Sequence, residues 1–136
     1  MKYFIVPLVV AVIVHLIKIL VDLLKKRFSW NRILGYGGMP SVHSALVASL
    51  ATLAYLLEGF SLSFAIALIL ALLVMRDALG LRGYLSTHGR IINKLIKDLP
   101  DEEEYKYPVM EETIAHSLSQ IAVGALLGMV ITFLLF

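Results

Sequence analysis

The chain has 136 residues, of which 60% are hydrophobic and 16% are charged, and its formal net charge is +2. Soluble domains average about 45–50% apolar and about 25% charged residues, so the composition excludes an ordinary soluble domain and predicts burial in lipid. The chain has no cysteine, which excludes disulfides and thiolate metal sites. A chain of this length is expected to form one domain, residues 1–136.

Four apolar stretches are long enough, or nearly so, to cross a bilayer as helices, which need about 20 residues. These stretches are residues 3–24, 42–57, 62–75 and 113–136. The first contains His15, Lys18 and Asp22 and has no small-residue cleavage site after it, which indicates a retained span rather than a signal peptide. The sequence therefore predicts an all-α integral membrane bundle of about four spanning helices.

The chain between the third and fourth apolar stretches is more polar. In residues 78–98, leucine and isoleucine alternate with arginine and lysine, which is typical of an amphipathic helix at the membrane interface. A break in this helix is predicted near residues 83–89. Residues 99–109 form an acidic loop whose run at 101–104 we interpret as solvated rather than as a cation site. We expect no bound metal and no cofactor.

The basic residues predict the orientation in the membrane. The 12 Lys and Arg residues all lie in residues 25–32 or 76–106, except Lys2 and Lys18. Four spans put both of these segments on one side, and the positive-inside rule makes that side cytoplasmic. We therefore expect a protein of the cell (inner) membrane with both termini outside, and no nucleic-acid partner.

Residues 37–45, Gly-Gly-Met-Pro-Ser-Val-His-Ser-Ala, are the strongest candidate for a site. Pro40 suits the first position of a helix, and the N–H groups at a helix N-terminus attract phosphate. Gly38 loosens the backbone, Ser41 adds a hydroxyl donor, and His43 can donate a proton near neutral pH. This loop therefore predicts an anion site with an acid beside it, open to the cytoplasm.

Polar side chains recur inside the first span. His15, Lys18, Asp22 and Lys25 are spaced by three or four residues and share one helix face. Two interpretations of this face stay open. It is a structural polar seam in which Asp22 pairs with a lysine, or it has a functional role in which Lys25 faces a ligand at the membrane surface. The same seam is the one feature that favours a small transporter or flippase.

The last span has a similar pattern, because His116, Gln120, Gly124 and Gly128 recur every four residues. The two glycines permit close packing against another helix. His116 lies near the start of the span, at the depth predicted for His43. Both histidines are therefore candidates to act on one substrate.

Arg76 and Asp77 end the third span at this same depth. They pair with each other, or Arg76 binds an anion through its planar guanidinium. Arg82 is a second candidate for that contact, whereas His88 is expected at the surface.

Three segments resemble one protein family. They are the loop at 38–45, the stretch Met-Arg-Asp-Ala-Leu-Gly-Leu-Arg at 75–82, and Ala-His-Ser at 115–117 leading into Gly-Ala-Leu-Leu-Gly at 124–128. In this order they resemble a divergent branch of the PAP2 superfamily, the DUF212 or YuiD-like membrane proteins related to acid phosphatases and vanadium-dependent haloperoxidases. The resemblance covers nearly the whole chain and implies a PAP2-like helical fold.

The resemblance also implies roles for the matching residues. His116 is the nucleophile that forms a phosphohistidine, and His43 is the general acid that protonates the leaving group. Gln120 stands where the superfamily has the aspartate that orients the nucleophile, and Glu112 and Asp77 are further candidates for orienting groups. The implied phosphate contacts are Gly38, Ser41, Lys25, Arg32, Arg76 and Arg82, with Arg76 or Arg82 replacing the motif arginine whose position Met110 occupies.

These features predict a metal-independent phosphatase that acts on a lipid or polyprenyl phosphate or pyrophosphate in the bilayer. The alternative is a non-enzymatic phospholipid- or anion-binding membrane protein that keeps the loop without turnover. The chain has fewer helices than the six-helix core of the superfamily, which leaves pairing of two subunits as a homodimer open.

Overall fold

The computed structural model describes residues 1–25, 38–100, 106–110, 112 and 114–136. The described residues form no strand, and their helices are α1 (Lys2–Leu24), α3 (Val42–Glu58), α4 (Leu62–Leu79), α5 (Leu81–Lys97) and α7 (Leu118–Leu135). The segments Lys2–Leu24, Leu62–Lys97 and Leu118–Leu135 are long and apolar enough to cross a membrane, and α3 is a shorter apolar helix. The predicted all-α membrane bundle is confirmed.

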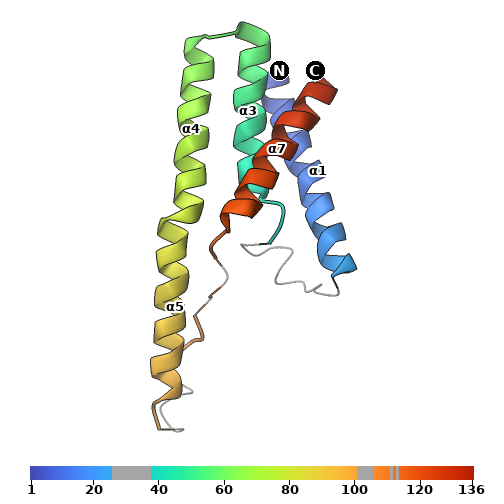
Figure 1. Ribbon diagram of the computed structural model, residues 1–136. Coiled ribbons are helices and arrows are strands. Elements are labelled where there is room, and N and C mark those ends of the chain that lie inside the picture. Colours follow the sequence, from blue (N-terminus) through green and yellow to red (C-terminus); the bar gives the residue numbers. More distant parts are fainter. Residues whose placement is uncertain (26–37, 101–105, 111, 113) are drawn as a thin grey trace.

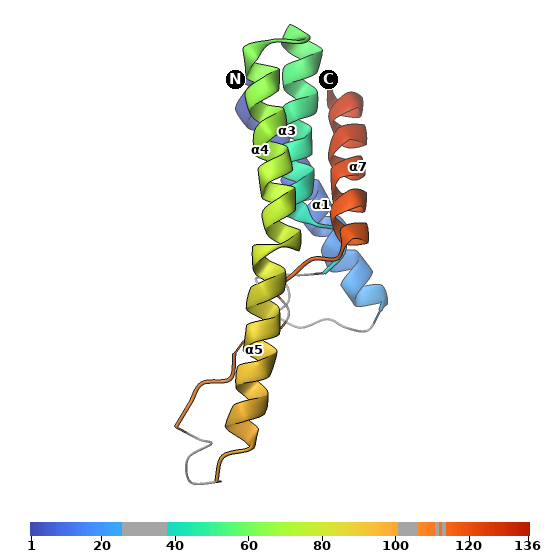
Figure 2. The same cartoon turned by 60° about the vertical axis from the view of Figure 1, so that its left-hand side comes forward.

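α3 is the central helix of the bundle (Figure 1). It contacts α1, α4 and α7, and both chain termini lie at the end of the bundle where α3 turns into α4. α5 continues the line of α4 and extends beyond the opposite end, which the rotated view also shows (Figure 2). The segments that lead into α3 and α7 lie toward that same opposite end.

Small residues on α3 explain how three helices can pack on it. Its buried face includes Ala45, Ala48, Ala51 and Ala54, whose short side chains let neighbouring backbones approach. Polar contacts add to this packing, because the Thr132 hydroxyl of α7 donates to the Ser49 hydroxyl at 2.7 Å in the buried interface. A buried hydroxyl that finds a partner in another helix avoids the cost of an unsatisfied polar group.

Two glycines let the backbone of α7 lie directly against α3 and its N-cap. A Cβ built at Gly124 would overlap the carbonyl oxygen of Ser41, and one at Gly128 would overlap that of Ala45. Neither position accepts a side chain unless a helix moves. The close packing predicted from the four-residue spacing is therefore found, and the partner of α7 at both glycines is the N-terminal end of α3.

The boundary between α4 and α5 differs from the prediction. α4 extends to Leu79 instead of residue 75, the interruption lies at Gly80, and α5 is continuous through residues 83–89. Gly89 is buried between Ser86 and Asn93, on the face of α5 that binds Met110 and Ala115. This packing offsets the roughly 1 kcal/mol by which a glycine weakens a helix interior, so the predicted break is wrong.

The last helix begins later than predicted, at Leu118 instead of residue 113. Ser117 is its N-cap and forms a capping box with Gln120. The Ser117 hydroxyl accepts from the Gln120 N–H at 3.3 Å, and the Gln120 side-chain oxygen accepts from the Ser117 N–H at 3.1 Å. These two bonds satisfy N–H groups that the helix itself cannot, and His116 therefore precedes the helix.

Candidate anion site at one end of the bundle

Charged and titratable side chains from four parts of the chain lie toward the end of the bundle from which α5 extends. His43 lies in the first turn of α3, His116 just before α7, Arg82 in the first turn of α5, and Lys18 in α1. The charges of Lys18 and Arg82 act on both imidazole rings, and the two imidazoles interact with each other. We call these four residues the cationic cluster.

The loop before α3 forms the helix N-terminus expected from the sequence, although its residues take different positions. Ser41 is the N-cap, and its Oγ accepts from the Ser44 N–H at 3.4 Å and from the Ser44 hydroxyl at 3.0 Å. Pro40 precedes this cap, so its predicted place in the first turn is wrong. Ser41 is 1% exposed, so its hydroxyl builds the helix end, and anion binding is left to the N–H groups of the first turn.

Contacts with α7 and α1 fix the loop in place. The Ser41 N–H donates to the Gln120 carbonyl at 3.1 Å. Gly38 has a φ of +86°, and a Cβ there would lie 3.0 Å from Cε of Lys18. Only glycine meets both conditions readily, and it allows the Lys18 side chain to lie against the loop.

The Gln120 side chain determines which nitrogen of His116 carries the hydrogen. Nδ1 of His116 lies 3.0 Å from Oε1 of Gln120, and the same oxygen accepts from the Ser117 N–H. Because a backbone N–H can only donate, the atom facing it is the amide oxygen, and Nδ1 must then be the donor to it. Gln120 therefore fixes the orientation of the His116 ring and makes Nδ1 the donor to it.

Burial lowers the pKa of His116 below its ordinary value, and this is the largest influence on it. The hydrogen bonds to Gln120 and to the Gly38 backbone oppose the shift, while the charges of Lys18 and Arg82 reinforce it. A lowered pKa keeps the imidazole neutral to a lower pH than an exposed histidine. His116 is thus suited to act as a neutral base near neutral pH.

Lys18 is the member of the cluster that the sequence analysis did not place in the site. It is 7% exposed although it lies within the first apolar span. A lysine in a span is costly unless it serves a partner or a ligand, so its position was itself the signal that could have identified it.

Asp77 holds the arginine of the cluster. The Arg82 Nε donates to Asp77 Oδ2 at 3.2 Å across the interruption at Gly80. Asp77 therefore pairs with Arg82 and not with its neighbour Arg76, although a pair with Asp77 is one of the two roles that the sequence leaves open for Arg76. Arg76 is instead exposed at the edge of a cavity between α4 and α7.

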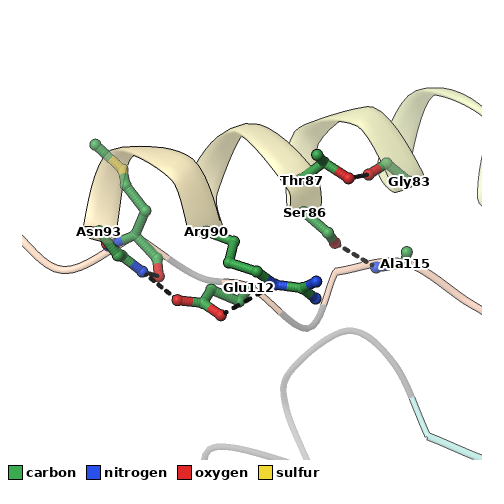
Figure 3. Close-up of polar contacts among 8 residues, drawn as sticks. Gly83, Ser86, Thr87, Arg90, Asn93, Glu112 and Ala115 are labelled. Atoms are coloured by element: carbon green, nitrogen blue, oxygen red, sulfur yellow. Dashed lines mark hydrogen bonds and ion pairs between the residues drawn. The ribbon is translucent and has the colours of Figure 1, made fainter. Parts of the chain in front are cut away.

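Residues 106–110, 112 and 114–117, which we call the return segment, are tied to α5 by polar contacts (Figure 3). The Asn93 side chain accepts from the Met110 N–H at 2.7 Å and donates to the Met110 carbonyl at 2.9 Å. The Ser86 Oγ accepts from the Ala115 N–H at 3.1 Å. These contacts lead to His116, whose N–H donates to the Ala78 carbonyl at 3.4 Å. α4 and α5 therefore position the backbone of His116 together.

Glu112 does not orient His116, because it belongs to this attachment. Its carboxylate accepts from Asn93 Nδ2 at 2.7 Å and lies 3.7 Å from Nε of Arg90 (Figure 3). The proposed orienting role required the last helix to include residue 112, and α7 begins at Leu118. Gln120 is the candidate that contacts the His116 ring.

Another predicted phosphate contact, Lys25, is not brought to the cluster. Lys25 is exposed at the C-terminal end of α1, beyond Lys18. Arg32 and the acidic run at 101–104 lie outside the residues that the structure describes.

The fold and this site define a helical membrane protein that gathers two histidines, two cations and a helix N-terminus at one end of its bundle. The chain belongs to the divergent PAP2 family, whose model matches residues 1–131. It is 32% identical over 125 residues to the uncharacterized membrane protein YuiD of Bacillus subtilis (strain 168), covering 83% of this chain and 79% of that protein. No solved structure matches the chain significantly.

Proposed function

We propose that this protein is a phosphatase that hydrolyses a lipid or polyprenyl phosphate or pyrophosphate. One observation carries this function, namely the convergence of His43 and His116 with the charges of Lys18 and Arg82 beside the N-terminus of α3. Phosphoryl transfer needs positioned positive charge and an in-line nucleophile more than it needs other chemistry. The membership in the divergent PAP2 family supports the same reaction class.

In this proposal His116 is the nucleophile and His43 is the general acid. Nε2 of His116 attacks phosphorus and forms an N–P bond, while the bond from phosphorus to the leaving oxygen breaks and His43 protonates that oxygen. Water then attacks the phosphohistidine, His43 accepts its proton, the N–P bond breaks and inorganic phosphate leaves. Lys18, Arg82 and the N–H groups of the α3 N-terminus stabilise the phosphate oxygens in both steps.

The substrate reaches this site from the bilayer, and we propose that the site faces the cytoplasm. Among the described residues, Lys25 ends α1 and four basic residues lie on α5, toward the end of the bundle that carries the cluster. Both termini lie at the other end (Figure 1). The positive-inside rule then puts both termini outside the cell membrane.

Phosphate release and a trapped intermediate test the function directly. The purified protein in detergent is incubated with ³²P-labelled lipid phosphate or polyprenyl pyrophosphate, quenched in alkali and digested. We expect free phosphate and an alkali-stable, acid-labile phosphopeptide that contains His116. Phosphate release by the wild type without a labelled peptide, under rapid quenching, would contradict the covalent route. Phosphate release by His116→Ala would contradict it as well.

A substitution at Lys18 provides a second test, which asks whether the charge of this side chain contributes to phosphate release. Lys18→Met keeps the length and apolar character of the side chain but removes the charge, and we expect kcat/KM for phosphate release to fall about 10²–10³-fold, as for other preorganised donors to a developing charge. The exposed Lys94 of α5 provides the control, and Lys94→Met should keep the wild-type rate. Equal rates for Lys18→Met and wild type would remove Lys18 from the site.

One observation favours the non-catalytic alternative, in which the protein binds a phospholipid or another anion. The partner of the His116 ring is the neutral amide of Gln120, which stabilises a developing imidazolium less than a carboxylate does. Saturable binding of lipid phosphate, lost in Lys18→Met, without phosphate release across a broad substrate panel would establish this function instead.

A further inference from the structure

A cavity of about 560 Å³ lies between the end of α4 and the beginning of α7. Leu79 and Gly80 line it from one helix, and Leu118, Ala122 and Ala125 line it from the other. Its size is within the range of pockets that hold small-molecule ligands. We call this cavity the α4–α7 groove.

The groove is an apolar notch at one end of the bundle. It lies where α4 ends and α7 begins. Gly80, Ala122 and Ala125 supply the space, whereas nearby positions on the same helices, such as Leu72 and Leu126, carry large exposed side chains. A hydrocarbon chain can therefore enter the surface at this notch.

The groove carries a positive charge and borders the cationic cluster. Arg76 is exposed and lines the groove, and the adjacent Asp77 holds Arg82 at 3.2 Å. The hydrogen bond from the His116 N–H to the Ala78 carbonyl joins the two helices next to the groove. An anionic headgroup whose chain lies in the groove thus meets Arg76. Arg76 directly precedes Asp77, the residue that holds Arg82.

We propose that the α4–α7 groove holds the single hydrocarbon chain of a lipid phosphate, with Arg76 drawing the phosphate toward the cluster. This inference rests on the proposed function and adds that the substrate enters laterally between α4 and α7. An arginine suits this contact because its planar guanidinium binds phosphate through paired hydrogen bonds.

Alkyl phosphates test the groove because chain length varies while the phosphate stays the same. We compare kcat/KM for hexadecyl phosphate and butyl phosphate in wild type and in Ala122→Trp, which fills the groove. The ratio of long-chain to short-chain kcat/KM should fall about tenfold in Ala122→Trp, as expected from losing burial of about two methylene groups. Ala65→Trp is the matched control, since Ala65 is exposed on α4 outside the groove, and its ratio should equal that of wild type.

Photolabelling tests the same groove without any turnover. A hexadecyl phosphate with a diazirine near the headgroup end of its chain is irradiated with the protein in vesicles, and labelled residues are mapped by mass spectrometry. We expect label at residues 75–80 and 118–125, with less label in Arg76→Gln and in Ala122→Trp. Unlabelled hexadecyl phosphate should compete for the label, whereas hexadecanol should not.

The two arms separate this inference from the phosphatase function. Labelling of the groove without phosphate release from any substrate would retain the groove and remove the enzyme. An unchanged chain-length ratio in Ala122→Trp, or label spread evenly over the lipid-facing side of α1, would overturn the groove even if phosphate is released.

Discussion

Replacement of His116 by alanine is expected to reduce phosphate release from lipid phosphates to the uncatalysed background. In the proposed reaction His116 supplies the attacking nitrogen. Its ring is buried and is held by Gln120, whose Oε1 lies 3.0 Å from Nδ1. Replacement of His43 by alanine should lower the rate of phosphate release about 10²–10⁴-fold, which is the usual contribution of a general acid. Release of inorganic phosphate from the purified variants measures both effects.

The leaving group distinguishes the roles of the two histidines. With nitrophenyl phosphate as substrate, a nitrophenolate leaves without being protonated, so His43→Ala should release one equivalent of nitrophenolate in a burst at nearly the wild-type rate. Its later turnover should stay slow, because His43 also accepts the proton of the water that hydrolyses the phosphohistidine. His116→Ala should show no burst. The exposed His88 of α5 is the matched control, and His88→Ala should behave as wild type with both substrates. Wild-type activity of folded His116→Ala, with helix content and elution volume unchanged, would exclude His116 as the nucleophile.

The second large effect is expected at Gly124. Gly124→Ala places a methyl group against the carbonyl of Ser41, where both contacting groups are backbone and cannot rotate away. Overpacking of this kind costs about 1–3 kcal/mol, and here it also displaces the N-cap of the helix that carries His43. We expect a lower unfolding temperature in detergent together with a large loss of activity.

A glycine in open space provides the control for Gly124. A Cβ at Gly83 would meet no atom within 4 Å, and alanine is favoured over glycine in a helix interior by about 1 kcal/mol. Gly83→Ala should therefore unfold at the same temperature as wild type or at a higher one. If Gly124→Ala and Gly83→Ala are equally stable, the contact between α7 and the N-terminus of α3 is not as close as described.

The helices were largely predictable because each span is a continuous apolar run. The first helix begins and ends within one residue of its prediction, at Lys2 and Leu24. Of the boundaries that differed, one depends on contacts with distant residues and another on a local cap. The continuity of α5 through Gly83 and Gly89 is supported by the return segment, and the start of α7 is set by the capping box of Ser117, a local signal that the apolar run obscured.

Parts of the candidate site were predictable for a similar reason. Local motifs identify His43, Gln120 and His116, because a glycine-rich helix start and a four-residue spacing can be recognised in the chain itself. The partners of these residues could not be found in this way. Lys18 is 20 residues from Gly38 in the sequence, yet a Cβ at Gly38 would lie 3.0 Å from its Cε.

The sequence by itself determined that this chain lies in a membrane, is helical, and carries a helix N-terminus and two histidines suited to phosphate chemistry. These properties follow from composition, periodicity and local motifs, which act over a few residues. Only the tertiary structure decided which charges join the histidines, because helix packing sets distances between side chains remote in sequence. It selected Lys18 and Arg82 for the cluster, assigned Glu112 to Asn93, and left Arg76 at the edge of the α4–α7 groove.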